Sequence, residues 1–401
     1  MIRFTTAGES HGKGLVAILE GVPAGLPLIA DDIDHQLRRR MAGYGRGARM
    51  KIESDAVEFI SGVRAGETLG SPIGLLIRNR DWDNWVDVMA AEPDEVESAK
   101  RRRRVTRPRP GHADLAGVLK YARSDARDIL ERASARETAA RVACGAVARR
   151  LLKEFGVEIG SHVIELGPVK ANVPPALPNP LNEAADVSPV RCLDPDASEA
   201  MVKAVDLAMK ERDTLGGVAE IVVSGAVVGL GSHVSWDRKL DGRLAGAVMS
   251  IPAVKGVEIG MGFEAARTRG SQVHDEIMRS QEIPRGGVSR VTNRAGGLEG
   301  GMTTGEPVVL RVAMKPISTL RRPLDTVNIE TGGEAKAQSE RSDVTAVPAM
   351  GVIAEAMAAL VLADAMSEKF GGDSLVEMRD NYERYLEALD ARWSKLGAKE
   401  D

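Results

Sequence analysis

The spacing of apolar residues divides the chain into predicted strands and predicted helices. Runs rich in Val, Ile and Leu, bounded by glycine or charged residues, predict strands at residues 14–20, 73–78, 218–228 and 308–314. Helical spacing of apolar residues predicts helices at residues 31–41, 112–123, 135–154, 198–210 and 348–369. Together these elements indicate a mixed α/β chain of the α+β type.

Two pairs of segments in the chain resemble each other. The sequence "ERASARETAARVACGAVARRLL" begins at Glu131 and "ERSDVTAVPAMGVIAEAMAALVL" at Glu340, while "LGSPIGLLI" at Leu69 resembles "TGEPVVLRV" at Thr304. The pairs favour one domain over residues 1–401 with an internal pseudo-two-fold repeat, and chance similarity between alanine-rich helices is the alternative. The proline-rich residues 172–197 are predicted to form a surface loop of this domain, and residues 373–401 a charged helical tail.

The bulk composition excludes several classes of protein. With 43% hydrophobic and 28% charged residues, the chain is typical of a soluble globular protein. Aromatic residues make up only 3%, which argues against a base-stacking platform, and a net charge of −4 provides no overall attraction to nucleic acid or acidic membranes. Cys144 and Cys192 lie far apart, which suits a reducing compartment and gives no zinc motif or other metal site.

Two segments bear on whether the protein is secreted or inserted in a membrane. The N-terminal "MIRFTTAGESHG" lacks the apolar run of a signal peptide. Residues 349–366 are the most apolar late segment, but they carry Glu355 and Asp364 and look too short and too charged to span a bilayer. A buried amphipathic helix is the better interpretation, and a cytoplasmic protein with no membrane partner is predicted.

Basic residues occur in blocks without acidic neighbours. One block holds Arg38 to Arg40, Arg46, Arg49 and Lys51, and another holds Lys100 to Arg104, Arg107 and Arg109. A solvated face, a nucleic-acid patch and a pocket for a small polyanion are the three interpretations. The run Arg101–Arg104 is best interpreted as surface. Glycines beside Arg46 and Arg49 let the backbone approach a ligand closely, and prolines beside Arg107 and Arg109 hold those side chains in place. Preorganised arginines suit bidentate capture of carboxylate or phosphate, which favours the polyanion pocket.

The stretch "TTAGESHGKG" places Ser10 and His11 in a glycine-rich loop. A nucleophile–base pair is disfavoured because consecutive side chains point in different directions, and Gly12 and Gly14 would make a poor first helical turn after a Ser10 cap. An anion site is the remaining interpretation.

Two further segments carry groups that suit phosphate. Ser134 and Glu137 form an S-x-x-E capping box, and Arg132 and Arg136 flank the same positive helix end. The segment "AMKPISTLRR" adds Lys315, Ser318 and Thr319 as a predicted phosphate cradle.

Seven motifs together resemble the chorismate synthase family. They are "GESHG", "RRRMAGYGRGARM", "RPRPGHAD", "RASARETAARVACGA", "NRAGGLEGGMTTG", "MKPIST" and "RSDVTAVPAMGVIAEAM", in the family's order over residues 1 to about 370. The resemblance implies anti 1,4-elimination of phosphate from 5-enolpyruvylshikimate 3-phosphate to give chorismate, with reduced FMN as a transient electron donor and no net redox change. It also implies a single β-α-β sandwich domain, a homotetramer, and an external flavin reductant, with NADPH acting only indirectly through a flavin reductase.

The resemblance also implies roles for individual residues. His11 faces the leaving phosphate, His112 stabilises the reduced flavin ring, and Ser10, Ser134 and Asp343 form a relay toward the flavin. The anion-binding arginines are Arg40, Arg46, Arg49, Arg109, Arg136 and Arg341. The FMN contacts are Arg132, Ala133, Ser134, Pro252, Ala253, Gly300, Lys315, Pro316, Ile317, Ser318, Thr319 and Arg341.

The sequence also allows other roles for Asp343 and for the whole chain. Asp343 could instead bond free backbone N–H groups at the start of the helix near Pro348. The chain could be another flavin-dependent lyase or oxidoreductase acting on a small phosphorylated acid. It could also be a noncatalytic RNA- or polyanion-binding protein that uses Arg101–Arg104.

Overall fold

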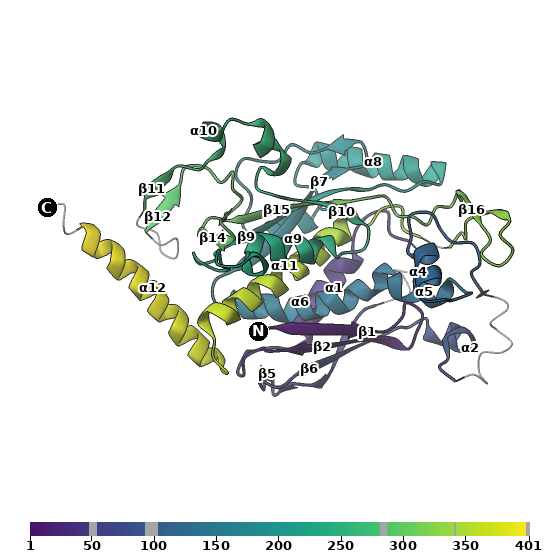
Figure 1. Ribbon diagram of the computed structural model, residues 1–401, viewed down its shortest axis with the longest axis horizontal. Helices are drawn as coiled ribbons and strands as arrows, with labels where there is room; N and C mark the ends of the chain where they lie inside the picture. The colour runs from purple at the N-terminus through teal and green to yellow at the C-terminus, as the bar shows by residue number, and fades with distance from the viewer. Residues whose placement is uncertain (48–53, 93–102, 281–286, 341, 398–401) are drawn as a thin grey trace.

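The computed structural model describes residues 1–47, 54–92, 103–280, 287–340 and 342–397 (Figure 1). It confirms a mixed α/β chain with several antiparallel sheets. The first sheet has four strands, and in sheet order these are β1 (Arg3–Ala7), β2 (Gly14–Glu20), β6 (Ile73–Arg78) and β3 (Val57–Ser61). Leu15, Ala17 and Leu19 alternate along β2 and are buried, so this face of the sheet meets the core.

The second sheet has five strands, also antiparallel. In sheet order they are β10 (Val254–Ile259), β15 (Val308–Met314), β9 (Gly217–Ser224), β7 (Glu158–Leu166) and β8 (Val169–Lys170). The strands predicted at 14–20, 73–78 and 308–314 are confirmed. The strand predicted at 218–228 ends at Ser224, because Gly225 has φ +76° and a side chain there would meet the carbonyl oxygen of Gly156.

A layer of helices lies between the two sheets (Figure 1). Its main members are α1 (Ala30–Met41), α6 (Thr138–Lys153), α9 (Leu240–Met249) and α11 (Val347–Phe370). α6 packs on β2 and β6 and also contacts β7, while α11 packs on β7, β9 and β15 and lies along α6. One hydrophobic core therefore runs through both sheets and the helices between them.

Helix α11 differs from its prediction. It has 24 residues, long and apolar enough by composition to cross a membrane, yet 89% of its most apolar window is buried inside the protein. It is not amphipathic, because the second sheet and helices α1, α6 and α9 surround it and nearly every face meets protein. The burial prediction is confirmed, and the helix predicted at 348–369 matches α11 to within one residue at each end. The amphipathic prediction is wrong, and so is the expectation that the apolar segment is too short to span a bilayer.

The other helices carry smaller corrections. The helix predicted at 112–123 is α4 (Asp114–Lys120), and that at 198–210 is α8 (Pro195–Glu211), which begins early because Asp194 caps it. The proline-rich residues 172–197 are not all loop, since they contain α7 (Leu181–Asp186). The remaining α-helices are α2 (Val86–Met89), α5 (Arg127–Ala133), α10 (Gly270–Val273) and α12 (Leu375–Gly397).

Short hairpins and 3-10 turns complete the described chain. The hairpin strands are β4 (Val63–Arg64), β5 (Glu67–Thr68), β11 (Ile277–Arg279), β12 (Val288–Arg290), β13 (Leu298–Glu299), β14 (Met302–Thr303), β16 (Asp325–Val327) and β17 (Glu334–Lys336). The 3-10 turns are η2 (Trp82–Asn84), η4 (Ala135–Glu137), η5 (Trp236–Arg238) and η6 (Gly262–Arg267).

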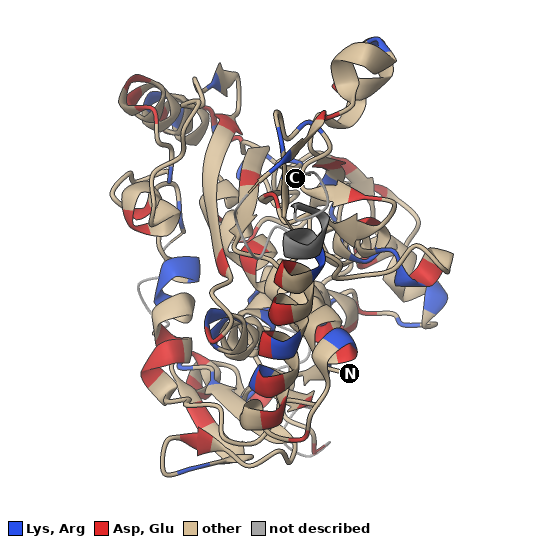
Figure 2. Cartoon of the chain, turned by 90° about the vertical axis from the view of Figure 1, so that its left-hand side faces the viewer, with Lys and Arg blue, Asp and Glu red and all other residues tan. Residues whose placement is uncertain are grey.

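Helix α12 extends away from the body of the protein (Figure 1). Its first part is anchored, because Leu375 and Met378 are buried in the core and Phe370 packs edge-to-face on Tyr382. Figure 2 shows acidic and basic residues alternating along it toward the C-terminus. This mixture of signs is typical of a solvated helix face.

Candidate active site

The loop between β1 and β2 presents Ser10 and His11 to helix α5. Ser10 donates its backbone N–H to the carbonyl oxygen of Glu131 at 3.0 Å. His11 donates its backbone N–H to Glu131 Oε2 at 2.9 Å, and its Nδ1 lies 2.9 Å from both carboxylate oxygens. Glu131 therefore fixes both the loop and the ring of His11.

Glu131 is a buried carboxylate that stays charged through its neighbours. Arg127 Nη1 donates to Glu131 Oε1 at 2.8 Å. Burial raises the pKa of Glu131, but the hydrogen bonds and charges of His11 and Arg127 outweigh burial and lower the pKa overall. The site thus holds an anion beside one ring nitrogen of His11.

Ser134 joins the loop to the start of α6. Its Oγ donates to Ser10 Oγ at 3.1 Å and accepts the N–H of Arg136 at 3.3 Å, so it caps η4. The predicted capping box is only half formed, because the Glu137 carboxylate accepts from Arg141 Nε at 3.0 Å instead. Ser10 and His11 face different partners, as expected for consecutive residues, and do not form a hydrolytic pair.

Arg40 and Arg136 converge on a buried acid, Asp55. Arg136 Nη1 lies 2.5 Å from Asp55 Oδ1, and Arg40 Nη1 lies 3.5 Å from Oδ2. Asn79 accepts from Arg136 Nε at 2.9 Å and donates to the carbonyl oxygen of Gly12 at 2.7 Å, which ties the pair to the histidine loop. Two buried guanidinium groups thus share one carboxylate.

Burial dominates the electrostatics of Arg40. Burial lowers its pKa, Asp55 raises it, and Arg136 and Arg46 lower it again, giving about 10. An anionic ligand beside this group would offset both the burial and the repulsion between the guanidinium groups. The prediction of an anion-binding arginine at this position therefore fits the surroundings of Arg40.

Asp343 lies against the "AGYGRG" loop. Gly47 donates its N–H to Asp343 Oδ1 at 2.6 Å, and Arg46 Nε lies 3.3 Å from Oδ2. At the start of α11 the N–H of Val347 donates to Thr345 Oγ1 at 3.4 Å, whereas the Asp343 carboxylate accepts from Gly47. The alternative of Asp343 as a helix cap is therefore wrong, and its carboxylate points across to another segment.

The second histidine forms a matching pair with a carboxylate. His112 Nδ1 lies 2.5 Å from Oδ1 of the fully buried Asp114, whose two oxygens also accept from Arg109 Nε at 2.8 Å and Nη2 at 3.1 Å. Burial raises the pKa of Asp114, and His112 and Arg109 lower it far more, so the carboxylate is ionised. Both histidines therefore commit Nδ1 to a charged acid.

The predicted phosphate cradle lies against this second pair. Arg109 Nη1 donates to Thr319 Oγ1 at 2.9 Å, and Lys315 Nζ donates to the carbonyl oxygen of Gly111 at 3.0 Å. Lys315 also donates its backbone N–H to the carbonyl oxygen of Ala253 at 2.9 Å. Burial, and then the charge of Lys255, lower the pKa of Lys315.

Contacts between segments distant in sequence bring helix α5, the segment around Asp343 and the phosphate cradle toward one region. Arg127 Nη2 lies 3.1 Å from Glu340 Oε1, three residues before Asp343. Thr214 donates to the carbonyl oxygen of Ile317, and the next residue, Leu215, donates to that of Val344. The chain thus gathers residues from six motifs that are far apart in sequence.

The comparisons with known proteins agree with one another. A family model described as chorismate synthase matches residues 2–367. The curated chorismate synthases of Salinispora tropica and Streptomyces coelicolor are 59% and 58% identical over 397 residues, covering 98% of this chain and 100% and 99% of those proteins. The chain belongs to the chorismate synthase family. A solved structure described as a crystal structure of chorismate synthase matches with 45% identity and a TM-score of 0.78, over 97% of this chain and 98% of that one.

Membership of the chorismate synthase family establishes the class of activity. The chain is an enzyme, a lyase with chorismate synthase activity, which belongs to the shikimate pathway and aromatic amino-acid biosynthesis. The noncatalytic RNA-binding alternative is thereby excluded as the protein's main role.

Some residues that the resemblance names are not brought into this region. Gly300 is exposed in the turn between β13 and β14, and the next residue, Gly301, accepts from Leu240 at the first turn of α9. Pro252 and Ala253 follow the other end of α9, about 15 Å away for a ten-residue helix. Within one chain, Gly300 and Ala253 therefore do not meet.

Three other arginines were predicted to bind substrate or FMN. Arg132 donates to the carbonyl oxygens of Thr6 and Gly8, at 2.9 and 3.2 Å, and its Nη2 lies 3.8 Å from Glu137 Oε1 at the start of α6. Arg49 and Arg341 lie outside the described residues, as do Arg101 and Arg102 of the arginine run.

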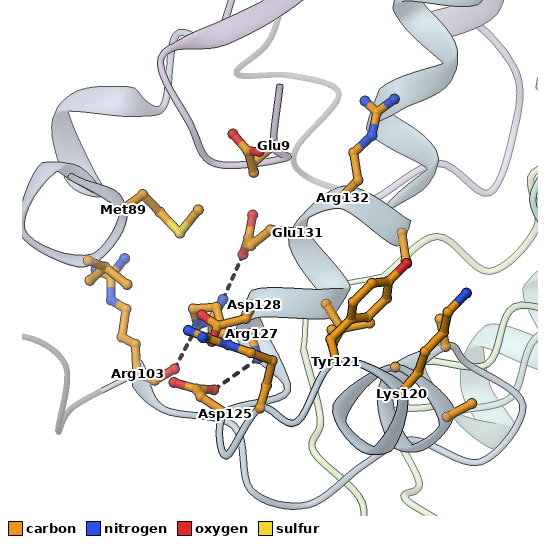
Figure 3. A pocket seen from close by; sticks show the side chains of 17 residues that line it. Glu9, Met89, Arg103, Lys120, Tyr121, Asp125, Arg127, Asp128, Glu131 and Arg132 are labelled. Atoms are coloured by element: carbon orange, nitrogen blue, oxygen red, sulfur yellow. Dashed lines mark hydrogen bonds and ion pairs between the residues drawn. The ribbon is translucent and has the colours of Figure 1, made fainter. Parts of the chain in front are cut away.

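A cavity of about 860 Å³ opens beside the histidine loop, between α2, α4 and α5. Figure 3 shows Glu9, Met89 and Glu131, from three separate elements, pointing toward one another across it. Its lining includes the predicted FMN contacts Arg132 and Ala133.

Sequence reasoning missed the side chains that hold the candidate histidines and arginines in place. Asp114 and Glu131 lie inside the motifs "RPRPGHAD" and "ERASARE", so a search for acids beside each histidine or arginine could have found them. Asp55 and Asn79 have no local signal, because only the tertiary fold brings them to Arg136.

Proposed function

We propose that this chain converts 5-enolpyruvylshikimate 3-phosphate to chorismate and phosphate at the region formed by the two histidine–carboxylate pairs and the buried arginines. The observation that supports this best is the pairing itself. Each histidine gives Nδ1 to an ionised buried acid, and guanidinium groups suited to carboxylate and phosphate lie beside both.

The arginines would bind the substrate's carboxylates and phosphate. Arg40, Arg46 and Arg136 lie beside the carboxylates of Asp55 and Asp343, and burial is the main cause that lowers the pKa of Arg40. A substrate with two carboxylates and a phosphate would bring further negative charge to these guanidinium groups. Arg49 and Arg341 are proposed to join them, on the resemblance alone.

The residues around Lys315 fit a bound FMN. Lys315, Ser318 and Thr319 provide a cation and hydroxyl donors suited to a phosphate, and Lys255 adds positive charge nearby. This donor set supports the contacts at 315–319 that the family resemblance implies. Contacts at 132–134, 252–253 and 341 are proposed on the resemblance alone, while Gly300 of the same chain lies apart from Ala253. When bound, reduced FMN would supply electrons transiently, so that phosphate leaves without net redox change.

The histidines would handle protons through the nitrogen that faces away from the acid. With Nδ1 held by Glu131 or Asp114, exchange with a ligand goes through Nε2. His11 is proposed to hold a proton at the leaving phosphate, and His112 to donate a hydrogen bond to the cofactor ring. Ser10 and Ser134, joined at 3.1 Å, are proposed with Asp343 to carry a proton away from the ring.

Broader features are proposed from the family resemblance. The two sheets and their central helices are proposed to be the family's β-α-β sandwich, with an internal pseudo-two-fold that pairs α6 with α11 and β6 with β15. A homotetramer, an external flavin reductant and a cytoplasmic location complete the proposal.

Anaerobic turnover tests the proposed function. The purified chain is mixed with substrate and dithionite-reduced FMN, and chorismate is followed by its absorbance. Product is expected only with reduced FMN. Equal turnover with oxidised FMN and no reductant would overturn the cofactor role, and no product in either state would overturn the proposed reaction.

A further inference from the structure

Trp85 lies directly on the ring of His11. The two ring centroids are 3.8 Å apart and the planes are inclined by only 22°, so the rings are stacked. Trp85 sits between η2 and α2, in a stretch that the motifs of the site do not include. The indole therefore covers a histidine to which it is not linked by sequence.

Arg103 covers the other face of the same indole. Its Cζ lies 4.1 Å from the ring centroid of Trp85. Because the imidazole already occupies one face at 3.8 Å, a guanidinium at this distance fits only on the opposite face. Arg103 thus stacks as a cation on an aromatic ring, and this arginine of the basic run is more than a solvated surface residue.

Hydrogen bonds also link the two outer members of this stack, Arg103 and His11. Arg127 Nε donates to the carbonyl oxygen of Arg103 at 2.7 Å, and its Nη1 binds Glu131, which holds His11. Trp85 is anchored separately, because its Nε1 donates to Asp81 Oδ2 at 2.9 Å. Every member is therefore fixed by two neighbours.

We propose that Trp85 is a positioning residue for His11, held in place by Arg103. Glu131 fixes the imidazole in its own plane through Nδ1, but a hydrogen bond in the ring plane does not by itself prevent the ring from tilting about that bond. The indole face removes that freedom and fixes the direction of Nε2 toward the ligand. This inference rests on the proposed role of His11 in the elimination.

Three variants separate positioning from general stability. Trp85→Ala removes the aromatic face, Trp85→Phe keeps a face but loses the bond to Asp81, and Trp82→Ala removes a tryptophan of the same turn that contacts Lys13 instead. Trp85→Ala is expected to lower kcat about 10²-fold with little change in KM or FMN affinity, since a small misplacement of a reacting group costs about that much. Trp85→Phe should recover most of kcat, and Trp82→Ala should stay near wild type.

Proton NMR of the histidine ring gives a readout without turnover. The ring protons of His11, assigned by their loss in His11→Ala, should be shifted upfield by the indole and move downfield in Trp85→Ala but not in Trp82→Ala. Unchanged kcat in Trp85→Ala, or equal losses in both tryptophan-to-alanine variants, would overturn the positioning role. A wild-type chain that makes no chorismate would instead overturn the proposed function, and the role of His11 with it, even where NMR reports the stack.

Discussion

At the scale of single residues, the site depends on acids that orient its histidines and pair with its arginines. Glu131 and Asp114 each bind a histidine and an arginine, and Asp55 binds two arginines. Removing any one acid would leave a buried cation without its partner, which is costly. These acids are therefore as much part of the site as the groups they hold.

Two arginines on one helix separate ligand binding from surface charge. Arg40 is buried beside Asp55, whereas Arg38 is exposed and pairs with Asp31. Arg40→Ala should weaken substrate binding by about 2–5 kcal/mol, the scale for losing one partner of a buried charge pair. Arg38→Ala should change it by about 0–1 kcal/mol. Calorimetric titration of the FMN complex with substrate measures both, and equal losses would place Arg40 outside the binding region.

Asp343 offers a test of the proton relay. Its Oδ1 accepts from Gly47, and an asparagine amide oxygen can accept the same bond but cannot act as a base. Asp343→Asn should keep its melting temperature and its FMN affinity, while turnover falls by about 10² or more. Thermal unfolding and stopped-flow turnover decide between the roles. A variant that loses stability but keeps normal turnover per folded molecule would remove Asp343 from the relay.

Sequence alone could predict the candidate site residues but not the side chains that hold them. Ser10, His11, Arg109 and His112 lie in distinctive glycine- or proline-rich motifs, so their chemistry is readable locally. No local motif marks Trp85 or Asp55 as part of the site, because each acts through a contact made by the tertiary fold.

At the scale of elements, the sequence predicts best where one face is buried. β2 alternates buried and exposed residues, and its predicted limits match the structure. β7 was not predicted, because both its faces are buried and its middle holds Gly160, Ser161 and His162 instead of an alternating pattern. α11 was misread as amphipathic for the same reason, since burial on all sides leaves no polar stripe.

Close packing of α6 on α11 depends on one glycine. A Cβ added at Gly145 would lie 2.4 Å from the Cβ of Ala356 and 2.6 Å from its Cα, so the helices would have to separate. Gly145→Ala should destabilise the fold by about 1–3 kcal/mol, the usual cost of overpacking. Its control is Gly246 in α9, where a Cβ meets nothing within 4 Å.

Gly246→Ala should stabilise the protein by about 0.5–1 kcal/mol, because alanine loses less backbone freedom in a helix than glycine does. Urea unfolding of both variants beside the wild type measures the two effects. The opposite signs are the test: stabilisation by both substitutions would show that α6 and α11 do not pack as closely as described.

At the scale of the whole molecule, one buried acid joins the helical layer to the second sheet. Glu355 of α11 accepts from Arg39 of α1 at 2.8 Å, Arg149 of α6 at 2.7 Å and Arg191 at 3.1 Å. Ser161 of β7 donates to the same carboxylate at 2.5 Å. Because Arg39 precedes Arg40, this network also fixes the end of α1 that carries an arginine of the site.

The network makes stability depend on pH in a defined range. Burial raises the pKa of Glu355, but the charges of Arg39, Arg149 and Arg191 lower it from 4.5 to about 2. A lowered folded-state pKa gives stability that is fully present above the ordinary value and is lost as the pH falls toward the folded value. The contribution of Glu355 should therefore be complete above about pH 5 and disappear progressively toward pH 2.

Glu355→Gln isolates this contribution from those of other acids. At pH 7 the variant should be about 3–5 kcal/mol less stable, because three buried guanidinium groups lose their shared counter-charge. The control Glu58→Gln alters an exposed pair with Arg78 and should cost about 0–1 kcal/mol. In urea unfolding at pH 7, 5 and 3, the gap between wild type and Glu355→Gln should narrow at the lowest pH. Below the ordinary pKa of 4.5, Glu355 of the unfolded wild type binds a proton while the folded carboxylate stays ionised until about pH 2, which favours unfolding of the wild type alone. A gap that stays constant from pH 7 to pH 3 would mean that Glu355 is not the ionised centre of this network.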